Sequence, residues 1–333
     1  MKLGPSAVIA AATAATALLA CGGKPKPAQL APLPDDKPPP AAPKPAEPAP
    51  EPPAVEEAPP APKGPIEVKL PAQQTKVKLI AKGAGKLAPL RYTGKAGGKQ
   101  QVELALNFST TESMGDQKNE VVIPTIVLRG EAETRSIAKD GAADYAISIS
   151  GTDARDVPGA RLKTDDLKQM LASLTGLVIS GTIAANGAAG DVTLRVEKPD
   201  QLTEGALEMV RLTLPTLPVL PAEPIGVGAK WQTTTTTTLA DKIAVTQTTD
   251  YELVAAKGGT WSIKGKTAIT GADQDLHGGK ISNIHGSGQS ELVLAAGALY
   301  PSYKSSVETQ FTASEKDQSM TLSLRTGGAV TAK

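Results

Sequence analysis

Two aspartates and two histidines in one glycine-rich stretch have side chains that could bind a divalent metal ion. Asp273, Asp275 and His277 occupy alternate positions, so on a β-strand they would share one face. His285 could join them across a turn at Gly278-Gly279, and carboxylate and imidazole groups suit zinc or a similar ion. The spacing matches no compact metal motif, and the glycines are typical of an exposed hairpin. We therefore interpret the stretch as a solvated loop and keep a metal-dependent hydrolase as an alternative.

The rest of the sequence contains no arrangement that is typical of a catalytic or phosphate-binding site. Gly226 and Gly228 are followed by Trp231 and a run of threonines, whereas a phosphate loop needs a helix N-terminus behind it. No Gly-x-Ser-x-Gly elbow occurs. With two histidines in all, a Ser-His-Asp site would have to form around them. We expect no enzyme and no cofactor.

The threonine run from Thr233 to Thr238 would place hydroxyl groups on both faces of a strand. Because β-branched residues favour strands, the run predicts an exposed or edge strand. Recognition of a partner through these hydroxyl groups is the alternative.

The first twenty residues have the layout of an export signal. Lys2 supplies a short positive start, and residues 7–17 form an apolar run that is long enough for a signal and too short to span a bilayer. Leu18-Leu19-Ala20 then precedes Cys21, which is the only cysteine in the chain. This arrangement resembles a bacterial lipoprotein signal; an ordinary secretory signal with an incidental cysteine is the alternative.

The resemblance implies that the Cys21 thiol receives a diacylglycerol, that cleavage occurs before Cys21, and that the new amine is acylated. Two or more acyl chains would give stable membrane anchoring. Gly22-Gly23 follows instead of an aspartate, and by the sorting rule of enterobacterial lipoproteins this implies the outer membrane. We therefore expect a lipid-anchored protein that faces the periplasm or the cell surface.

Composition divides the chain into a signal peptide (1–20), a lipidated cysteine with a proline-rich tether (21–64) and one β-rich domain (65–333), in which 65–199 and 215–333 are candidate pseudo-halves. Sixteen of the 43 residues from 22 to 64 are proline, which favours an extended, disordered spacer of up to about 130 Å. Thirty-five basic residues nearly balance 34 acidic ones, and only 3% of residues are aromatic. We identify no basic cluster and expect no nucleic-acid partner.

Period-two alternation predicts strands, each with one buried face, through most of the domain. One-sided strands in series favour antiparallel pairing. Turns are expected at Gly97-Gly98, Gly258-Gly259 and Gly327-Gly328. The alternating apolar sets are Val102, Leu104, Leu106 and Phe108; Tyr145, Ile147 and Ile149; Val192, Leu194 and Val196; Tyr303, Ser305, Val307, Thr309 and Phe311; and Met320, Leu322 and Leu324.

Two helices should interrupt the strands. The first would be capped by Thr164, carry an apolar stripe at Leu167, Met170, Leu171 and Leu174, and end at Gly176. The second would run from about Asp200 to Leu212, with Leu202, Ala206 and Met209 on one side. The prolines of residues 214–221 then predict an extended crossing. The fold class we predict is mainly β (α+β): a curved antiparallel sheet or open half-barrel with two short helices packed on it.

The segment from Pro224 to Trp231 reads PIGVGAKW. It resembles a short motif of uncharacterised bacterial envelope lipoproteins, Pro-Val/Ile-x-Val-Gly-x-x-Trp, that opens the second half of a β-domain. More distantly, the order of elements is similar to the open half-barrels of lipid-carrier lipoproteins. These resemblances imply a fold and a compartment, with no residue carried over to a binding site.

Together these features predict a non-catalytic envelope binding or structural module, anchored in the membrane through Cys21, that engages an envelope protein or a cell-wall component. The first alternative is a carrier that holds a lipid or another apolar ligand between the sheet and the helices around Leu171 and Met209. The second alternative is the metal-dependent hydrolase at His277 and His285.

Overall fold

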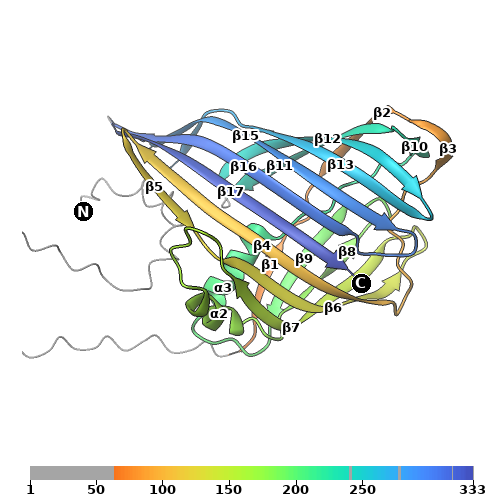
Figure 1. Ribbon diagram of the computed structural model, residues 1–333, viewed down its shortest axis with the longest axis horizontal. Helices are drawn as coiled ribbons and strands as arrows, with labels where there is room; N and C mark the ends of the chain where they lie inside the picture. The colour runs from red at the N-terminus through yellow and green to blue at the C-terminus, as the bar shows by residue number, and fades with distance from the viewer. Residues whose placement is uncertain (1–63, 240–241, 277–278, 317, 333) are drawn as a thin grey trace, which may run out of the picture.

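The computed structural model describes residues 64–239, 242–276, 279–316 and 318–332, and strands dominate them (Figure 1). Two short helices, α2 (Thr164–Ala172) and α3 (Thr203–Thr213), interrupt the strands. The prediction of a mainly β fold, with an antiparallel sheet and two short helices, is confirmed.

The strands are β1 (Ile66–Leu70), β2 (Thr75–Ala81), β3 (Ala84–Ala88), β4 (Lys99–Met114), β5 (Gln117–Val122), β6 (Thr125–Ile137), β7 (Ala143–Arg155), β8 (Val178–Ile183), β9 (Ala189–Val196), β10 (Ile225–Val227), β11 (Lys230–Leu239), β12 (Ile243–Lys257), β13 (Thr260–Thr270), β14 (Gln274–Leu276), β15 (Gly279–Ala295), β16 (Ser302–Glu315) and β17 (Gln318–Ala332).

Fifteen of these strands form one open antiparallel sheet, and β3 and β10 form a separate pair. The strand order is β1-β9-β8-β7-β6-β4-β17-β16-β15-β13-β12-β11-β2, with β14 beside β15 and β5 beside β4. The pairing of β4 with β17 joins strands from the first part of the chain to those from the last part. The domain boundaries at 64/65 and between pseudo-halves stay predictions.

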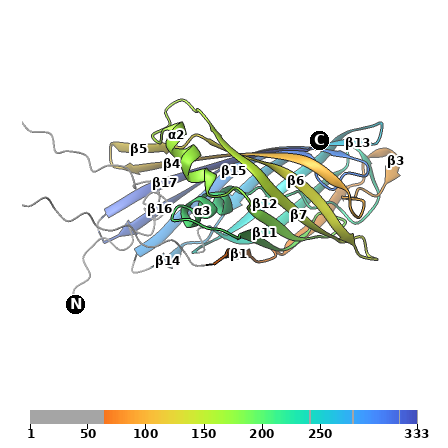
Figure 2. The ribbon, with the colours of Figure 1, turned by 90° about the horizontal axis from the view of Figure 1, so that it is seen from below.

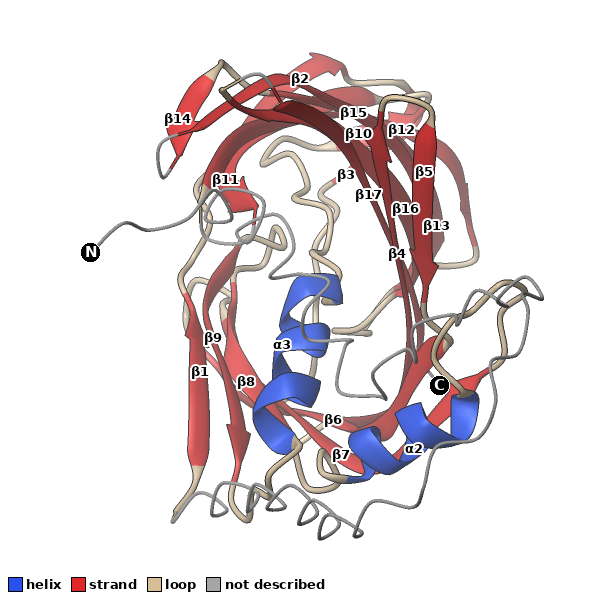
Figure 3. Ribbon diagram, turned by 90° about the vertical axis from the view of Figure 1, so that its left-hand side faces the viewer, coloured by secondary structure: helices blue, strands red, loops and turns tan. Residues whose placement is uncertain are grey.

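The two edge strands of the sheet, β1 and β2, are consecutive in the sequence. Only residues 71–74 join them, and such a link spans at most about 18 Å. The Ala72 N–H donates to Asp191 Oδ1 of β9 at 2.8 Å, and Gln73 Nε2 donates to Thr237 Oγ1 of β11 at 3.2 Å. The link therefore contacts the strand beside each edge. The strands that lie between these two edges in the sheet are found on several sides of α3 (Figure 3).

The main core lies between the helices and one face of the sheet, which we call the inner face. Every second residue of β4 from Val102 to Phe108 is at most 8% exposed, as the alternation predicts. The other predicted apolar faces are also found: Ile147, Ile149, Leu194, Val196, Tyr303, Phe311, Met320 and Leu322 are buried, and Tyr145, Val192, Val307 and Leu324 pack against the buried clusters.

Helix α2 buries Leu167 and Leu171, and Leu174 follows in the turn after it, also buried. It packs on β7 and contacts α3, and Figure 2 shows the two helices together. The predicted cap is displaced by one residue, because Lys163 is the N-cap and makes no side-chain capping bond. The Thr164 hydroxyl instead donates to the Asp156 carboxylate, which holds it away from the helix amides.

Helix α3 begins three residues later than predicted, at Thr203. The Asp200 carboxylate accepts hydrogen bonds from the Leu202 N–H and the Thr203 hydroxyl, at 2.9 and 3.0 Å, so Asp200 precedes the helix and supports its first turn. Leu202 is 40% exposed, and its assignment to the buried stripe is wrong. Ala206, Leu207 and Val210 supply the buried side.

Turns occur at Gly97-Gly98 and Gly258-Gly259 as predicted, but Gly327-Gly328 lies inside β17. Gly327 pairs with Asn107 of β4 and Ser306 of β16, so the strand continues through both glycines. A Cβ atom at Gly328 would lie 3.6 Å from the Pro215 ring. This is an ordinary van der Waals distance, so the chain that follows α3 passes directly over Gly328 on the inner face.

Residues 214–224 form neither helix nor strand, as their prolines predict. Side chains from β11 and from the segment before β4 hold this crossing: Trp231 Nε1 donates to Val219 O at 3.0 Å, and Tyr92 Oη donates to Pro218 O at 2.8 Å. Arg91 donates to the carbonyl oxygens of Pro221 and Ala222. The backbone groups of a segment without regular structure thus find partners inside the protein.

Candidate functional site

The face of the sheet that points away from the core, which we call the outer face, is polar over many strands. Directly paired residues share a face, so the register defines rows of side chains that cross the sheet. One row runs through Thr246, Thr270, His285, Gln310, Ser323, Thr111 and Glu120, from β12 to β5. Hydroxyl, amide, imidazole and carboxylate groups therefore lie side by side on one face.

Another row on the outer face alternates in charge. Lys230, Glu252, Lys264, Glu291 and Lys304 are paired in this order across β11, β12, β13, β15 and β16. The Lys230–Glu252 and Lys264–Glu291 ion pairs measure 4.0 and 3.5 Å. Exposed pairs such as these contribute little stability, at most about 1 kcal/mol each. A shift in register would separate each lysine from the glutamate opposite it, so the row helps to fix the strand pairing.

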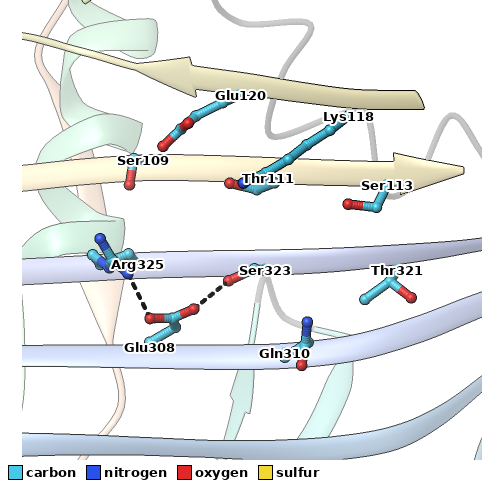
Figure 4. A pocket seen from close by; sticks show the side chains of 10 residues that line it. All are labelled: Ser109, Thr111, Ser113, Lys118, Glu120, Glu308, Gln310, Thr321, Ser323 and Arg325. Carbon is cyan, nitrogen blue, oxygen red and sulfur yellow. Dashed lines mark hydrogen bonds and ion pairs between the residues drawn. The ribbon is translucent and has the colours of Figure 1, made fainter. Parts of the chain in front are cut away.

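A groove of about 390 Å³ opens on the outer face where β5, β4, β17 and β16 lie side by side (Figure 4). We call it the polar groove. All of its lining side chains are polar or charged: Ser109, Thr111, Ser113, Lys118, Glu120, Glu308, Gln310, Thr321, Ser323 and Arg325. Alternate positions of β4 and β17 supply hydroxyl groups to the groove, and the intervening residues Thr110, Leu322 and Leu324 lie on the inner face.

The charged groups of the polar groove are organised around Glu308. Arg325 Nη2 lies 2.7 Å from one carboxylate oxygen, and the Ser323 hydroxyl donates to the other at 2.9 Å (Figure 4). The hydrogen bond from Arg325, followed by that from Ser323, lowers the pKa of Glu308 below its ordinary value. The same contact raises the pKa of Arg325. At neutral pH the groove therefore holds a fixed ion pair, with Lys118 and Glu120 on the neighbouring strand β5.

This arrangement can hydrogen-bond a polar partner, since it presents both donors and acceptors on short side chains. Its volume falls in the range of ligand sites, but typical small-molecule pockets are mostly apolar. The lining includes neither histidine nor cysteine, and the Glu308 carboxylate, which accepts a hydrogen bond from the Ser323 hydroxyl, is also paired with Arg325. The groove is chemically suited to recognition.

None of the ten groove residues was predicted as a site residue. The signal in the sequence is weak: Ser109, Thr111 and Ser113 alternate with buried positions, as do Thr321, Ser323 and Arg325. Alternation assigns these side chains to a solvated face. Their meeting across four strands depends on the pairing of β4 with β17, about 210 residues apart in the chain.

Two carboxylates of the candidate metal loop, Asp273 and Asp275, lie beside Lys280, and Asp275 is its direct cross-strand partner between β14 and β15. Asp273 lies 2.7 Å from Lys280 Nζ, and this contact raises the pKa of the lysine. His285 lies on the outer face in β15, and its Nδ1 is 2.8 Å from Asn283 O. His277 lies outside the described residues. Within the described ranges, no three Asp, Glu, His or Cys side chains are grouped to hold a metal ion, and the hydrolase alternative stays a prediction.

The threonine run belongs to β11, which pairs with both β2 and β12 as far as Thr235 and with β12 alone from Thr236 to Leu239. Thr233 is 6% exposed on the inner face, whereas Thr236 is exposed on the outer face. The edge-strand prediction is therefore wrong for Thr233 to Thr235 and holds for the remainder. Gly226 and Gly228 lead into this strand, as expected, instead of into a helix.

The candidate lipid-attachment residue Cys21, the signal peptide and all but the last residue of the tether lie outside the described residues. No family model matches the sequence, and no curated protein matches it either. In the described part of the chain, no helix is both long enough and apolar enough to cross a membrane. The lipoprotein resemblances therefore stay predictions.

Proposed function

We propose that this protein is a non-catalytic binding or structural module of the bacterial cell envelope, and that the polar groove is its main recognition site. The observation that carries this proposal is the groove itself: about 390 Å³ on the outer face, lined throughout by hydrogen-bonding side chains. Its partner is a polar segment of an envelope protein or a cell-wall component. We also propose that Cys21 is lipidated and anchors the module in the outer membrane, with the proline-rich tether as spacer.

The packing of the helices favours this function over the carrier alternative. A carrier would hold its ligand between the sheet and the helices around Leu171 and Met209. In this place Leu171, Leu174, Leu207 and Val210 are at most 1% exposed and belong to the main core cluster, and Met209 packs against the same cluster. These side chains already use the apolar surface that a lipid would need.

The build of the polar groove also suits recognition. Its walls are neighbouring strands that are hydrogen-bonded along their lengths, and short serine and threonine side chains lose little conformational entropy when a partner binds. The Glu308–Arg325 pair orients two charged groups before any partner arrives. Such pre-organisation improves affinity because less ordering is needed on binding.

Native mass spectrometry tests the choice between module and carrier. The full chain with Cys21→Ser, which has no thiol for acylation, would be purified from cells without detergent and its lipids extracted in parallel. We expect the mass of the bare chain. A lipid that copurifies at near-stoichiometric amount would contradict the proposal and make the carrier the better account.

A further inference from the structure

Positive charge is concentrated in one part of the chain. Residues 68–102 contain eight basic residues and no acidic one, a charge of +8, so the rest of the chain carries 1 − 8 = −7. The interpretation that the sequence has no basic cluster is therefore wrong, because the overall balance hides a local excess. The eight residues are Lys69, Lys76, Lys78, Lys82, Lys86, Arg91, Lys95 and Lys99.

Four of these lysines lie in one area that we call the basic flap, made of residues 75–88 (the sheet-edge strand β2 and β3) and of β10, which pairs with β3. Figure 1 shows the three strands together at one end of the molecule. Lys76, Lys78, Lys82 and Lys86 are all exposed. Within the described residues, no ion pair neutralises any of them. Three acidic residues belong to neighbouring elements: Glu223 precedes β10, Asp250 of β12 accepts a hydrogen bond from Gln232, and Glu252 of β12 pairs with Lys230.

The basic flap also exposes large apolar side chains. Ile80 of β2 is 57% exposed, Leu87 of β3 is 44% exposed, and Val227 of β10 is 43% exposed. Single exposed apolar residues are common on soluble proteins and need no explanation. Here three of them lie in the basic flap together with four lysines that form no ion pair within the described residues, so apolar and cationic groups are exposed side by side.

Backbone contacts hold the basic flap in place. The Gly226 N–H donates to Lys82 O at 2.8 Å, and the Gly228 N–H donates to Leu253 O of β12 at 2.8 Å. Gly83 has a φ of +76°, and a Cβ atom there would come within 2.3 Å of Gly226 O. Glycine at this turn therefore allows β3 to lie close against β10. The flap is a preformed surface, in which β2 is the edge strand of the main sheet and the β3–β10 pair lies next to it.

We propose that the basic flap docks onto the surface of an anionic phospholipid bilayer. Lysines near such a surface are attracted by its negative potential, and exposed aliphatic side chains enter the boundary between headgroups and acyl chains. A soluble polyanion would satisfy the lysines and leave Ile80, Leu87 and Val227 in water, so the combination favours a bilayer. This contact goes beyond the proposed function and does not depend on the polar groove or on lipidation of Cys21.

The test uses the full chain with Cys21→Ser, in which an introduced Ala84→Cys is the only thiol and carries an environment-sensitive fluorophore. Vesicles of phosphatidylcholine alone are compared with vesicles of equal parts phosphatidylcholine and phosphatidylglycerol, and polyphosphate serves as a soluble polyanion. A label at Ser319→Cys, an exposed position outside the flap, is the control for insertion by other parts of the chain.

We expect a blue shift from the flap label with anionic vesicles, at a lipid concentration at least about tenfold lower than with neutral vesicles. Lys82→Glu with Lys86→Glu should raise that concentration at least about tenfold, and Ile80→Ser with Leu87→Ser should remove the shift. The matched controls, Lys163→Glu with Lys198→Glu and Ile137→Ser with Val293→Ser, are at exposed positions outside the flap and should change neither.

Three results would overturn the proposal. The first is an equal response to neutral and anionic vesicles. The second is a response that the flap substitutions leave unchanged or that the control substitutions reduce equally. The third is the same shift with polyphosphate, insensitive to Ile80→Ser and Leu87→Ser, which would identify an anionic polymer as the partner.

Discussion

The indole of Trp231 stacks on the ring of Tyr251, with centroids 5.3 Å apart and an angle of 21° between the rings. The two residues are a direct cross-strand pair of β11 and β12 on the inner face. Trp231 also donates to Val219 O, so one side chain joins the sheet to the proline-rich crossing that follows α3. An aromatic pair in this position stabilises both the strand register and the crossing.

The same crossing is held by Tyr92, whose hydroxyl donates to Pro218 O. Burial raises the pKa of Tyr92 well above its ordinary value, so the hydroxyl keeps its proton. We expect Tyr92→Phe to lower the free energy of unfolding by about 1–2 kcal/mol, because it leaves a buried carbonyl without its donor. Tyr300→Phe is the matched control: the Tyr300 hydroxyl is buried without a partner among the described residues, so its removal should be neutral or stabilising. Denaturant unfolding of both variants tests the difference, and equal destabilisation would contradict it.

The packing of α2 predicts a large effect of a cavity. Leu171 is fully buried in the main core, so Leu171→Ala should lower the free energy of unfolding by about 2–5 kcal/mol. Leu202, which is 40% exposed before α3, provides the comparison: Leu202→Ala should change stability by no more than about 0.5 kcal/mol. The midpoints of chemical denaturation would show this. A small effect at Leu171 would mean that the helix region is loosely packed, and would revive the carrier alternative.

Two glycines in neighbouring strands should respond differently to the same substitution. A Cβ atom at Gly130, beside a bulge in β6, would lie 2.1 Å from Ser148 O, whereas one at Gly151 in β7 would meet nothing within 4 Å. Gly130→Ala should therefore destabilise by about 1–3 kcal/mol. Gly151→Ala should be neutral or stabilise by about 0.4–1 kcal/mol, through loss of entropy in the unfolded chain. Thermal unfolding of both variants would reveal this contrast, and the reverse order of stability would contradict the close approach of Gly130 to Ser148 O.

The Glu308 contacts predict a pH dependence of stability. The pKa of Glu308 is lowered in the folded protein, so its contribution is present above the ordinary value of 4.5 and is lost as the pH falls through the lower folded value. Between about pH 6 and pH 3 the unmodified protein should lose more stability than Glu308→Gln, by up to about 0.5 kcal/mol because the pair is exposed. In the background of Arg325→Gln this difference should shrink. If the difference kept its size, a group other than Arg325 would be the cause of the lowered pKa of Glu308.

Elements with one buried side could be predicted from the sequence. The alternation from Val102 to Phe108 and the stripe at Leu167 and Leu171 both reflect such burial. Prediction from the sequence was wrong where contacts with residues distant in the chain determine the local structure. Gly327-Gly328 has the composition of a turn, yet pairing with the strands on both sides keeps it extended. Thr164 was displaced as a cap by its bond to Asp156.

The polar groove illustrates the same limit for function. Each of its strands shows only a solvated polar face, which most antiparallel strands possess. The groove arises because β17 pairs with β4 and β5 folds back beside them, and no local pattern encodes that register. The basic run in residues 68–102, by contrast, can be read directly from the sequence; a whole-chain charge balance conceals it.

The most direct test of the proposed function is photo-cross-linking in living cells from a photoreactive residue at Thr111, inside the polar groove. We predict a discrete cross-linked envelope partner from Thr111, no such product from Lys198, an exposed position after β9, and loss of the product when Ser109→Arg fills the groove. Equal products from Thr111 and Lys198, or a product that survives Ser109→Arg, would contradict the claim that the groove is the recognition site.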